Sequence, residues 1–284
     1  MIVVTGATGK LGAAIIESLL EGTSAADVVA SVREPGKAHA LVALGVDVRQ
    51  GDFDRPDTLV RSFDGADRLL LISASGIDHE GRAAQHRRAI RAAVEAGVGH
   101  VFYTSLLPGD GSVAYVMKAH LDTEADLRSS GLAFTILRNG AYAEGWRLYL
   151  GDVSGGEAVV PGDGPVSWVS RSDLADGTAR LLLGAGHAGE TRNLTGPGAI
   201  DLKGTAGILG RVRARPIVRR IVPVEDYVSR AVAAGKTEEF AREWATTYFG
   251  LERGEFGKVD PFLGALVGRP LRTLEEVLAQ AAHD

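Results

Sequence analysis

Short apolar runs alternate with longer amphipathic stretches along the first 140 residues. The apolar runs predict strands at Ile2–Thr5, Asp27–Val32, Val46–Gln50, Arg68–Ser73, His100–Ser105 and Ala133–Arg138. The stretches between them predict helices at Leu11–Glu21, Lys37–Leu44, Thr58–Phe63, Glu80–Ala96 and Lys118–Ser129. Continuous apolar strands separated by helices are typical of a parallel sheet, because each parallel connection needs a crossover. The pattern therefore predicts an α/β fold with a Rossmann-type, doubly wound parallel sheet.

The helix expected at Glu80–Ala96 shows which of its faces should be buried. An apolar stripe with helical spacing is made by Ala83, Ile90, Ala93 and Val94, and the arginines Arg82, Arg88 and Arg91 fall largely off it. His86, in the same helix, is interpreted as a structural residue.

The pattern of apolar and polar residues changes after Gly140. Residues 152–164 are rich in Gly, Pro and Asp and are expected to form loop and turn. Beyond them the pattern predicts helices at Ser172–Leu183 and Leu202–Leu209, strands at Arg192–Leu194 and Ile217–Val222, and two or three C-terminal helices. We expect a main domain of residues 1–150, with part of 165–195, and a smaller, interleaved C-terminal α/β lobe at 151–284.

Composition narrows the classes of function. The 284 residues carry a formal net charge of −5, which gives no basic field for nucleic-acid phosphates, and they include no cysteine. The absence of cysteine excludes thiolate metal sites and cysteine nucleophiles and fits a reducing compartment. Met1 leads directly into a strand, and the apolar runs are far shorter than the ~18 residues of a membrane span. We expect a cytoplasmic protein that binds neither membrane nor nucleic acid.

The glycine-rich segment between the first strand and the first helix is the strongest motif. In Thr5–Gly12, TGATGKLG, the glycines have the spacing G-x-x-G-x-x-G. Gly6 permits a tight turn, Gly9 lets the backbone approach a diphosphate, and Gly12 lets the helix pack against the strand. The free N–H groups of the following helix would then face phosphates. The alternative is a tight strand-to-helix turn with no ligand.

The residue after the second strand bears on the choice of cofactor. Where an NAD site usually carries a carboxylate, this chain has Arg33, whose guanidinium matches a 2′-phosphate and so predicts NADP(H). Glu34 is the rival if the strand register differs by one residue, and a solvated surface arginine is the plain alternative.

Two further segments follow strands at the edge where ligands bind in open α/β sheets. Asp52, after the third strand, could accept a hydrogen bond from an adenine amino group or could cap a helix. The small residues 73–76, after the fourth strand, would let the backbone run beside a cofactor.

These motifs, followed in order by QHRRAI, VFYTSL, HLDTEADLRSSGLAFTILRNGAY and VSRSDLADG, resemble a known family. The chain is similar to the NmrA-like atypical short-chain dehydrogenases/reductases, and within them to NAD(P)H:quinone oxidoreductase type 2 and triphenylmethane reductase. The likeness covers residues 1 to about 195 and thins toward the C-terminus.

The resemblance implies a cofactor site along the predicted sheet edge and a nearby arginine. The residues that it implies are Gly6, Ala7, Thr8, Gly9, Lys10, Leu11, Gly12, Arg33, Asp52, Phe53, Ile72, Ser73, Ala74, Ser75, Tyr103, Thr104, Ser105, Leu137, Arg138, Asn139, Gly140, Tyr142 and Arg171. Tyr142 could equally be a core residue.

The proton donor of ketone-reducing enzymes in this superfamily is not in place. Tyr115 and Lys118 are three residues apart instead of four, a spacing that can still place both on one helix face. The resemblance, aligned on the TILRN segment, places His120 where related enzymes have the lysine and Val116 where the tyrosine would be. Hydride addition to a ketone needs a positioned acid, whereas addition to a quinone or a cationic dye does not. His120 could orient or protonate the acceptor, with Lys118 as a weaker candidate, or it could be an ordinary helix histidine.

Two functions are therefore expected to compete. The first is an NADPH-dependent reductase of a quinone or similarly conjugated aromatic acceptor, with no metal and a possible homodimeric state. The second is a non-catalytic NADP(H)-sensing regulator of the NmrA-like type. An ether or isoflavonoid-type reductase is disfavoured by His120.

Overall fold

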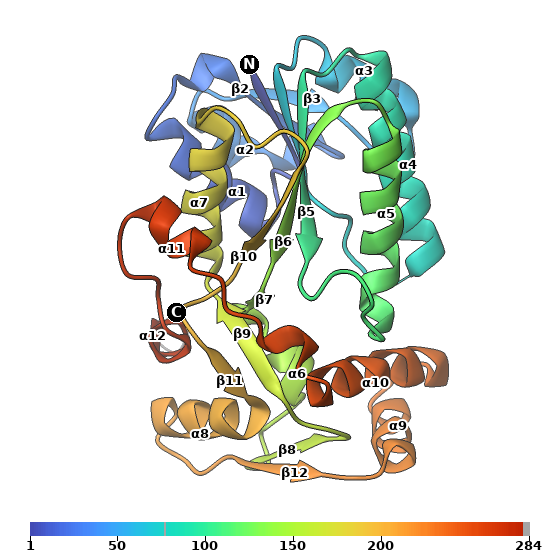
Figure 1. The fold of residues 1–284 in the computed structure, drawn as a ribbon, viewed down its shortest axis with the longest axis vertical. Helices are drawn as coiled ribbons and strands as arrows, with labels where there is room; N and C mark the ends of the chain where they lie inside the picture. The colour runs from blue at the N-terminus through green and yellow to red at the C-terminus, as the bar shows by residue number, and fades with distance from the viewer. Residues whose placement is uncertain (77, 281–284) are drawn as a thin grey trace. The chain divides into compact units, whose positions relative to one another are not determined.

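The computed structural model describes residues 1–76 and 78–280 (Figure 1). The chain divides into two compact units. The first unit contains Met1–Ser105, Ala119–Arg138 and Arg171–Arg192, and the second contains Leu106–Lys118, Asn139–Ser170 and Asn193–Asp284. The chain thus passes repeatedly from one unit to the other, and the expected boundary at residue 150 stays a prediction.

The strands include the six expected in the first half of the chain. Their bounds are β1 Ile2–Thr5, β2 Val28–Val32, β3 Asp47–Gln50, β4 Arg68–Leu71, β5 His100–Leu106, β6 Ala133–Asn139, β7 Ala141–Tyr142, β8 Glu157–Val160, β9 Pro165–Val169, β10 Glu190–Leu194, β11 Ala199–Asp201 and β12 Val218–Ile221.

The helices alternate with the strands in the first unit and dominate the C-terminal third of the chain. Their bounds are α1 Lys10–Leu20, α2 His39–Ala43, α3 Pro56–Phe63, α4 His79–Glu95, α5 Lys118–Ser129, α6 Arg147–Leu150, α7 Arg171–Leu183, α8 Leu202–Val212, α9 Val224–Ala233, α10 Glu238–Glu252, α11 Phe262–Val267 and α12 Leu274–Gln280.

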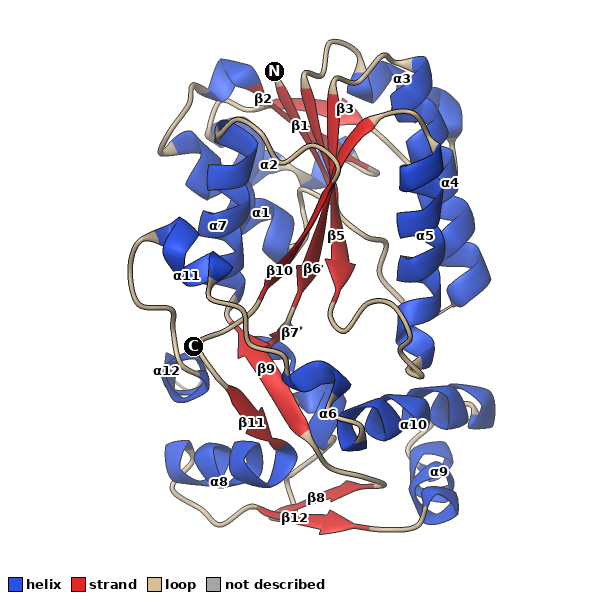
Figure 2. Ribbon diagram, viewed as in Figure 1, coloured by secondary structure: helices blue, strands red, loops and turns tan. Residues whose placement is uncertain are grey.

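A seven-stranded, mostly parallel sheet forms the centre of the first unit (Figure 2). Its strand order is β10-β6-β5-β4-β1-β2-β3, and β1 pairs in parallel with both β2 and β4. The order reverses direction at β1, so β1 and β4 flank the point where doubly wound sheets bind ligands. The predicted α/β fold with a Rossmann-type sheet is confirmed.

Helices cover both faces of this sheet, as Figure 1 shows, with α1 and α7 on one face and α3, α4 and α5 on the other. The core beneath α3, α4 and α5 is made of alternate strand residues, among them Leu69, Leu71, Val101 and Tyr103, all essentially inaccessible to solvent. Because strand side chains alternate between faces, these positions point one way and their neighbours the other.

Strand β4 ends two residues earlier than its apolar run predicted. Ile72 and Ser73 leave the ladder because their N–H groups donate to side-chain hydroxyls, Ile72 to Thr5 Oγ1 and Ser73 to Thr104 Oγ1, both at 2.9 Å. A side-chain acceptor has replaced the neighbouring strand.

The stripe predicted for α4 is correct at Ala83, Ile90 and Ala93 and wrong at two other positions. Arg82, expected off the buried face, is only 5% exposed, whereas Val94 is 49% exposed. Arg82 is buried because its guanidinium hydrogen-bonds inside the unit, which a hydrophobicity pattern does not register.

The second unit contains two small sheets, β11-β9-β7 and the parallel pair β12-β8. Strand β8 lies in the segment that was expected to be loop, so that expectation is wrong for Glu157–Val160. The strand forms there because its backbone pairs with β12, about 60 residues later in the chain. Four helices, α9 to α12, follow β12 within the described residues instead of two or three.

Candidate cofactor site

The glycine loop between β1 and α1 has little room for side chains. Gly6 adopts a φ of +59°, and its carbonyl accepts from the N–H of Gly9 at 2.9 Å. A Cβ on Gly12 would lie 2.4 Å from the Gly6 oxygen and 2.9 Å from the Ala7 Cα. The first and third glycines of the motif are thus required by backbone conformation and close packing.

The first turn of α1 leaves its backbone donors available. Gly9 is the N-cap and supplies no side-chain hydrogen bond, and no acidic residue lies in the first turn. Within the described residues no acceptor is recorded for the N–H groups of Lys10, Leu11 and Gly12, and the first helical bond is Ala13 N–H to Gly9 O at 2.9 Å. Unsatisfied donors at a helix N-terminus favour an anion. The residues present therefore fit the diphosphate of a dinucleotide.

Arg33 is the first residue after β2, as predicted, and its side chain is 73% exposed. Glu34, the rival residue, forms an ion pair with Lys37 at 2.8 Å and lies 3.7 Å from the Arg33 guanidinium. A hydrogen bond from Lys37, with its charge and that of Arg33, lowers the pKa of Glu34. Two cations thus surround one carboxylate at the end of β2.

Asp52 and Phe53 follow β3. The Asp52 carboxylate accepts from the N–H of Asp54 at 3.0 Å, and the N-cap of α3 is Arg55. Asp52 therefore stabilises a turn and does not cap the helix. The Phe53 ring packs edge-on against His86, with centroids 6.4 Å apart.

The loop after β4, Ile72–Ser75, is held from inside the unit. In addition to the bonds of Ile72 and Ser73, the N–H of Ala74 donates to His86 Nε2 at 2.8 Å, and the Ala74 carbonyl accepts from Arg82 Nε at 3.0 Å. Three successive backbone donors therefore have side-chain acceptors, and Ser75 at the end of the loop is exposed.

Behind this loop lies a buried polar cluster of Arg82, His86, Tyr103, His120 and Thr123. Arg82 lies 2.9 Å from His120 Nε2, and Tyr103 Oη lies 2.9 Å from His120 Nδ1. His86 Nδ1 lies 2.8 Å from Thr123 Oγ1. Sequence analysis took His86 as structural and placed Arg82 off the buried face, so it missed the cluster. The available signal was the i, i+4 spacing of the two residues in α4.

Both histidines of the cluster are neutral. Burial, reinforced by the charge of Arg82, lowers the pKa of His86 to about 3 and lowers the pKa of His120 well below its usual value. Each Nε2 also faces a group that can only donate, the Ala74 N–H or the Arg82 guanidinium.

The predicted residues at the ends of β5 and β6 have side chains bonded within the first unit. Ser105 Oγ donates to Glu124 at 2.7 Å, and Arg138 forms a two-bond ion pair with the same fully buried carboxylate. Thr104 holds the N–H of Ser73. Contacts of Tyr103, Ser105, Leu137 and Arg138 with a cofactor therefore stay predictions.

The remaining predicted residues are divided between the units. Arg171 begins α7 in the first unit, and Asn139, Gly140, Tyr142 and Lys118 belong to the second. The Oδ1 atom of Asn139 is buried with no partner in the described part of the chain, which fits a residue that awaits a ligand donor. The ammonium of Lys118, an exposed residue, lies 4.8 Å from the ring centroid of Tyr115.

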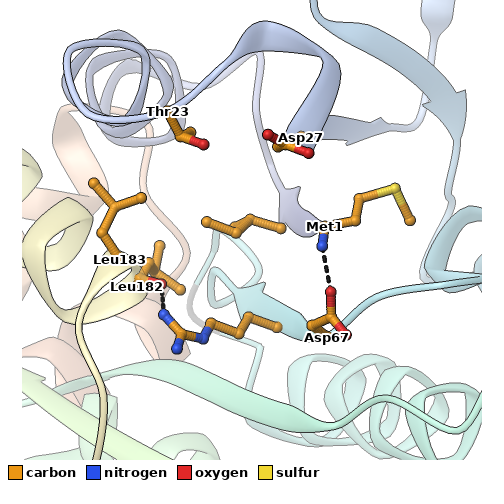
Figure 3. A pocket seen from close by; sticks show the side chains of 8 residues that line it. Met1, Thr23, Asp27, Asp67, Leu182 and Leu183 are labelled. Carbon is orange, nitrogen blue, oxygen red and sulfur yellow. Dashed lines mark hydrogen bonds and ion pairs between the residues drawn. The ribbon is translucent and has the colours of Figure 1, made fainter.

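A pocket of about 350 Å³ lies at the amino-terminal ends of β1, β2 and β4, and therefore at the other end of these strands from the glycine loop (Figure 3). Its lining includes Ile2, Asp27, Arg68 and Leu183, and the Met1 ammonium pairs with Asp67 beside it. None of the predicted site residues lines this pocket, and ligands of open α/β sheets bind at the carboxyl ends of strands.

Residues 1–76 and 78–280 contain neither a metal-binding cluster nor a membrane-spanning helix. No group of three or more His, Asp or Glu side chains is arranged to hold a metal ion. No helix in these ranges is long and apolar enough to cross a membrane.

The strand order, the glycine loop and the free helix N-terminus define a dinucleotide-binding α/β protein. Comparison with known proteins agrees, because residues 6–184 match the family described as NAD(P)H-binding.

Quinone oxidoreductase 2 of Escherichia coli is 36% identical over 97% of this chain and 96% of its own. An NmrA-like family domain-containing oxidoreductase of Aspergillus flavus is 34% identical over 94% of this chain and 90% of its own.

Solved structures give the same picture. An Escherichia coli NADPH-dependent quinone oxidoreductase complexed with NADPH has a TM-score of 0.91, with 35% identity over 99% of this chain and 100% of that one. The Citrobacter sp. triphenylmethane reductase complexed with NADP(H) has a TM-score of 0.89, with 35% identity over the same shares. The chain therefore belongs to the NAD(P)H-binding, NmrA-like family, as its motifs indicated.

Proposed function

We propose that the protein is an NADPH-dependent oxidoreductase that transfers hydride to a quinone or a similarly conjugated aromatic acceptor. The observation that carries this proposal is the glycine loop, whose close-packed backbone and unpaired first-turn donors fit a dinucleotide diphosphate. The similar proteins support the proposal, since one of them is an NADPH-dependent quinone oxidoreductase.

The charges at the end of β2 favour NADPH over NADH. Arg33 is exposed and able to form paired hydrogen bonds to a 2′-phosphate. The Glu34 carboxylate would repel that phosphate, but it forms an ion pair with Lys37, which offsets its charge. We therefore propose that Arg33 binds the 2′-phosphate.

The groups that could supply a proton favour a quinone as the proposed acceptor. NADPH, when bound, supplies a hydride, and its addition to a quinone gives a hydroquinone monoanion that takes one proton from water. A ketone would instead give a strongly basic alkoxide, which needs a positioned acid. The buried His120 is neutral and hydrogen-bonded at both ring nitrogens, so it is a poor acid. Lys118 stays the alternative proton source.

The test combines binding and turnover on the purified protein. NADPH affinity is measured by fluorescence titration, and NADPH oxidation is followed with a panel of quinones and triphenylmethane dyes. Turnover with quinones is expected. Tight binding with no turnover on any acceptor would instead identify the sensor function.

Arg33→Asp tests the choice of cofactor. It removes a charge-assisted pair and adds repulsion, so NADPH affinity should fall about 100-fold, which corresponds to about 2.7 kcal/mol. NADH affinity should change less than about threefold. Arg61→Asp, at an exposed arginine of α3, is the matched control. Equal losses for the two cofactors would show that Arg33 does not contact the 2′-phosphate.

A further inference from the structure

We propose that Arg82 and His86 are positioning residues that fix the loop after β4 by holding the backbone of Ala74, and that His120 affects the reaction only through Arg82. The inference rests on the proposed function, because Ile72–Ser75 is one of the segments expected to contact NADPH.

Both backbone polar groups of Ala74 are bonded to one helix. His86 accepts from the Ala74 N–H at 2.8 Å, and Arg82 donates to the Ala74 carbonyl at 3.0 Å. The two residues are one turn apart in α4, so their side chains leave the same face of the helix. A residue held at both its donor and its acceptor has a fixed peptide orientation on each side. The Ala74 N–H lies in the same peptide plane as the Ser73 carbonyl, so its bond to His86 also sets the direction of that carbonyl.

Arg82 is an unusual choice for this position. It is 5% exposed, and no carboxylate in the described ranges forms an ion pair with it. The charge of Asp78 favours the ionised guanidinium without forming an ion pair with it. A buried guanidinium with no direct ion-pair partner costs several kcal/mol, and an apolar residue would avoid that desolvation. Burial also lowers the pKa of Arg82. Packing therefore does not explain this residue, whereas a carbonyl that must be held beside a cofactor does.

The position of His120 defines its role. Arg82 has only donors, so His120 Nε2 accepts from it, and the proton of the neutral ring lies on Nδ1, directed at Tyr103 Oη. Both nitrogens are thus used within the cluster, and the side chain is 5% exposed. His120 can hold the guanidinium in place but has no free nitrogen for an acceptor molecule.

The test is a double-mutant cycle on the full-length protein, with Arg82→Met, His120→Leu and the double variant. We expect each single variant to lower kcat/KM with NADPH about tenfold. The double variant should be no worse than Arg82→Met, because His120 has nothing left to position. His120→Gln should restore most of the activity, since its amide can accept from Arg82 and donate to Tyr103. Arg91→Met, at an exposed α4 residue, is the matched control.

The pH dependence separates positioning from chemistry. The pH profile of kcat/KM should be the same for wild type and His120→Gln, because burial and the charge of Arg82 lower the pKa of His120 well below its usual value. Its ring is surrounded by Arg82, His86 and Tyr103, so no carboxylate of the cluster contributes a titration there.

A further tenfold loss on adding His120→Leu to Arg82→Met would overturn the proposal and make His120 a catalytic residue. An inflection present in wild type and absent in His120→Gln would do the same. If Arg82→Met does not fold, Arg82→Leu takes its place in the cycle, because leucine likewise leaves no donor for His120 to hold.

Amide hydrogen exchange of the cofactor-free protein tests the positioning independently of the proposed function. His86→Leu should speed exchange at Ala74 at least tenfold and leave the amides of α1 unchanged. Unchanged exchange at Ala74 would overturn the positioning role even in an active enzyme. A wild type that shows this protection but neither binds NADPH nor turns over would refute only the proposed function.

Discussion

Two loops of the first unit follow strands that lie side by side in the sheet, yet they treat their backbone donors in opposite ways. After β1, the glycine loop leaves the N–H groups of the first α1 turn without acceptors. After β4, three consecutive N–H groups are bonded to Thr5, Thr104 and His86. The first loop is suited to bind an anion, and the second is suited to be a fixed wall.

The difference shows how one sheet edge supplies two kinds of surface. Small residues suffice for the glycine loop, because its function depends on what is missing: a Cβ at Gly12 and a cap at Gly9. The β4 loop depends on side chains from β1, β5 and α4, all of them buried. Substitutions should therefore damage the two loops by different mechanisms.

The largest effect is expected for Gly12→Ala. The new Cβ would lie 2.4 Å from the Gly6 oxygen, so loop or helix must move. We expect a stability loss of about 1–3 kcal/mol and a fall in NADPH affinity of more than about 100-fold. Thermal unfolding and NADPH titration measure the two effects. The control is Gly207→Ala in α8, where a Cβ meets nothing within 4 Å. This substitution should stabilise the protein by about 0.5–1 kcal/mol. Similar behaviour of the two variants would refute the close-packing argument.

A smaller effect is expected from acid, which acts on the β4 loop through His86. The pKa of His86 is about 3 in the fold, far below that of the unfolded chain. The unfolded state therefore binds a proton that the native state refuses, and stability falls as the pH drops from the unfolded pKa toward 3. Going from pH 7.5 to 5, this residue alone should cost about 2 kcal/mol.

Urea unfolding at several pH values, compared between wild type and His86→Gln, isolates that contribution. Glutamine can still accept from the Ala74 N–H but does not titrate. Between pH 7.5 and 5 the variant should lose less stability than wild type, because its unfolding free energy lacks the pH dependence that comes from nearly one bound proton. Parallel curves for the two proteins would show that His86 is not held neutral.

The smallest effect is expected for Thr104→Val, which removes one acceptor and keeps the shape of the side chain. The partly buried N–H of Ser73 then loses its protein acceptor, which costs about 1 kcal/mol because water can replace part of the bond. NADPH affinity should weaken about threefold to tenfold as the loop loosens. Thr104→Ser keeps the hydroxyl and should behave as wild type in unfolding and titration. Loss of stability in the serine variant equal to that of the valine variant would point to packing instead of the hydrogen bond.

Sequence patterns were sufficient for the order of strands and helices in the first unit, because buried parallel strands are continuously apolar and their crossovers are helical. They failed at Glu157–Val160, where a short polar-flanked strand exists only through pairing with β12. They also failed at Val94, which is exposed. They failed at Arg82 because a helical stripe records apolarity and takes no account of a polar partner in another element, here the Ala74 carbonyl.

The candidate site divides along the same line. The spacing of Gly6, Gly9 and Gly12 and the place of Arg33 after β2 are local properties. The sequence by itself therefore determined the fold class, the glycine loop and the position of the arginine that we propose binds the 2′-phosphate. The cluster of Arg82, His86 and His120 joins α4 both to the loop after β4 and to α5. Only the tertiary structure decided it, since hydrogen bonds between residues 12 to 38 positions apart leave no periodic trace in a sequence.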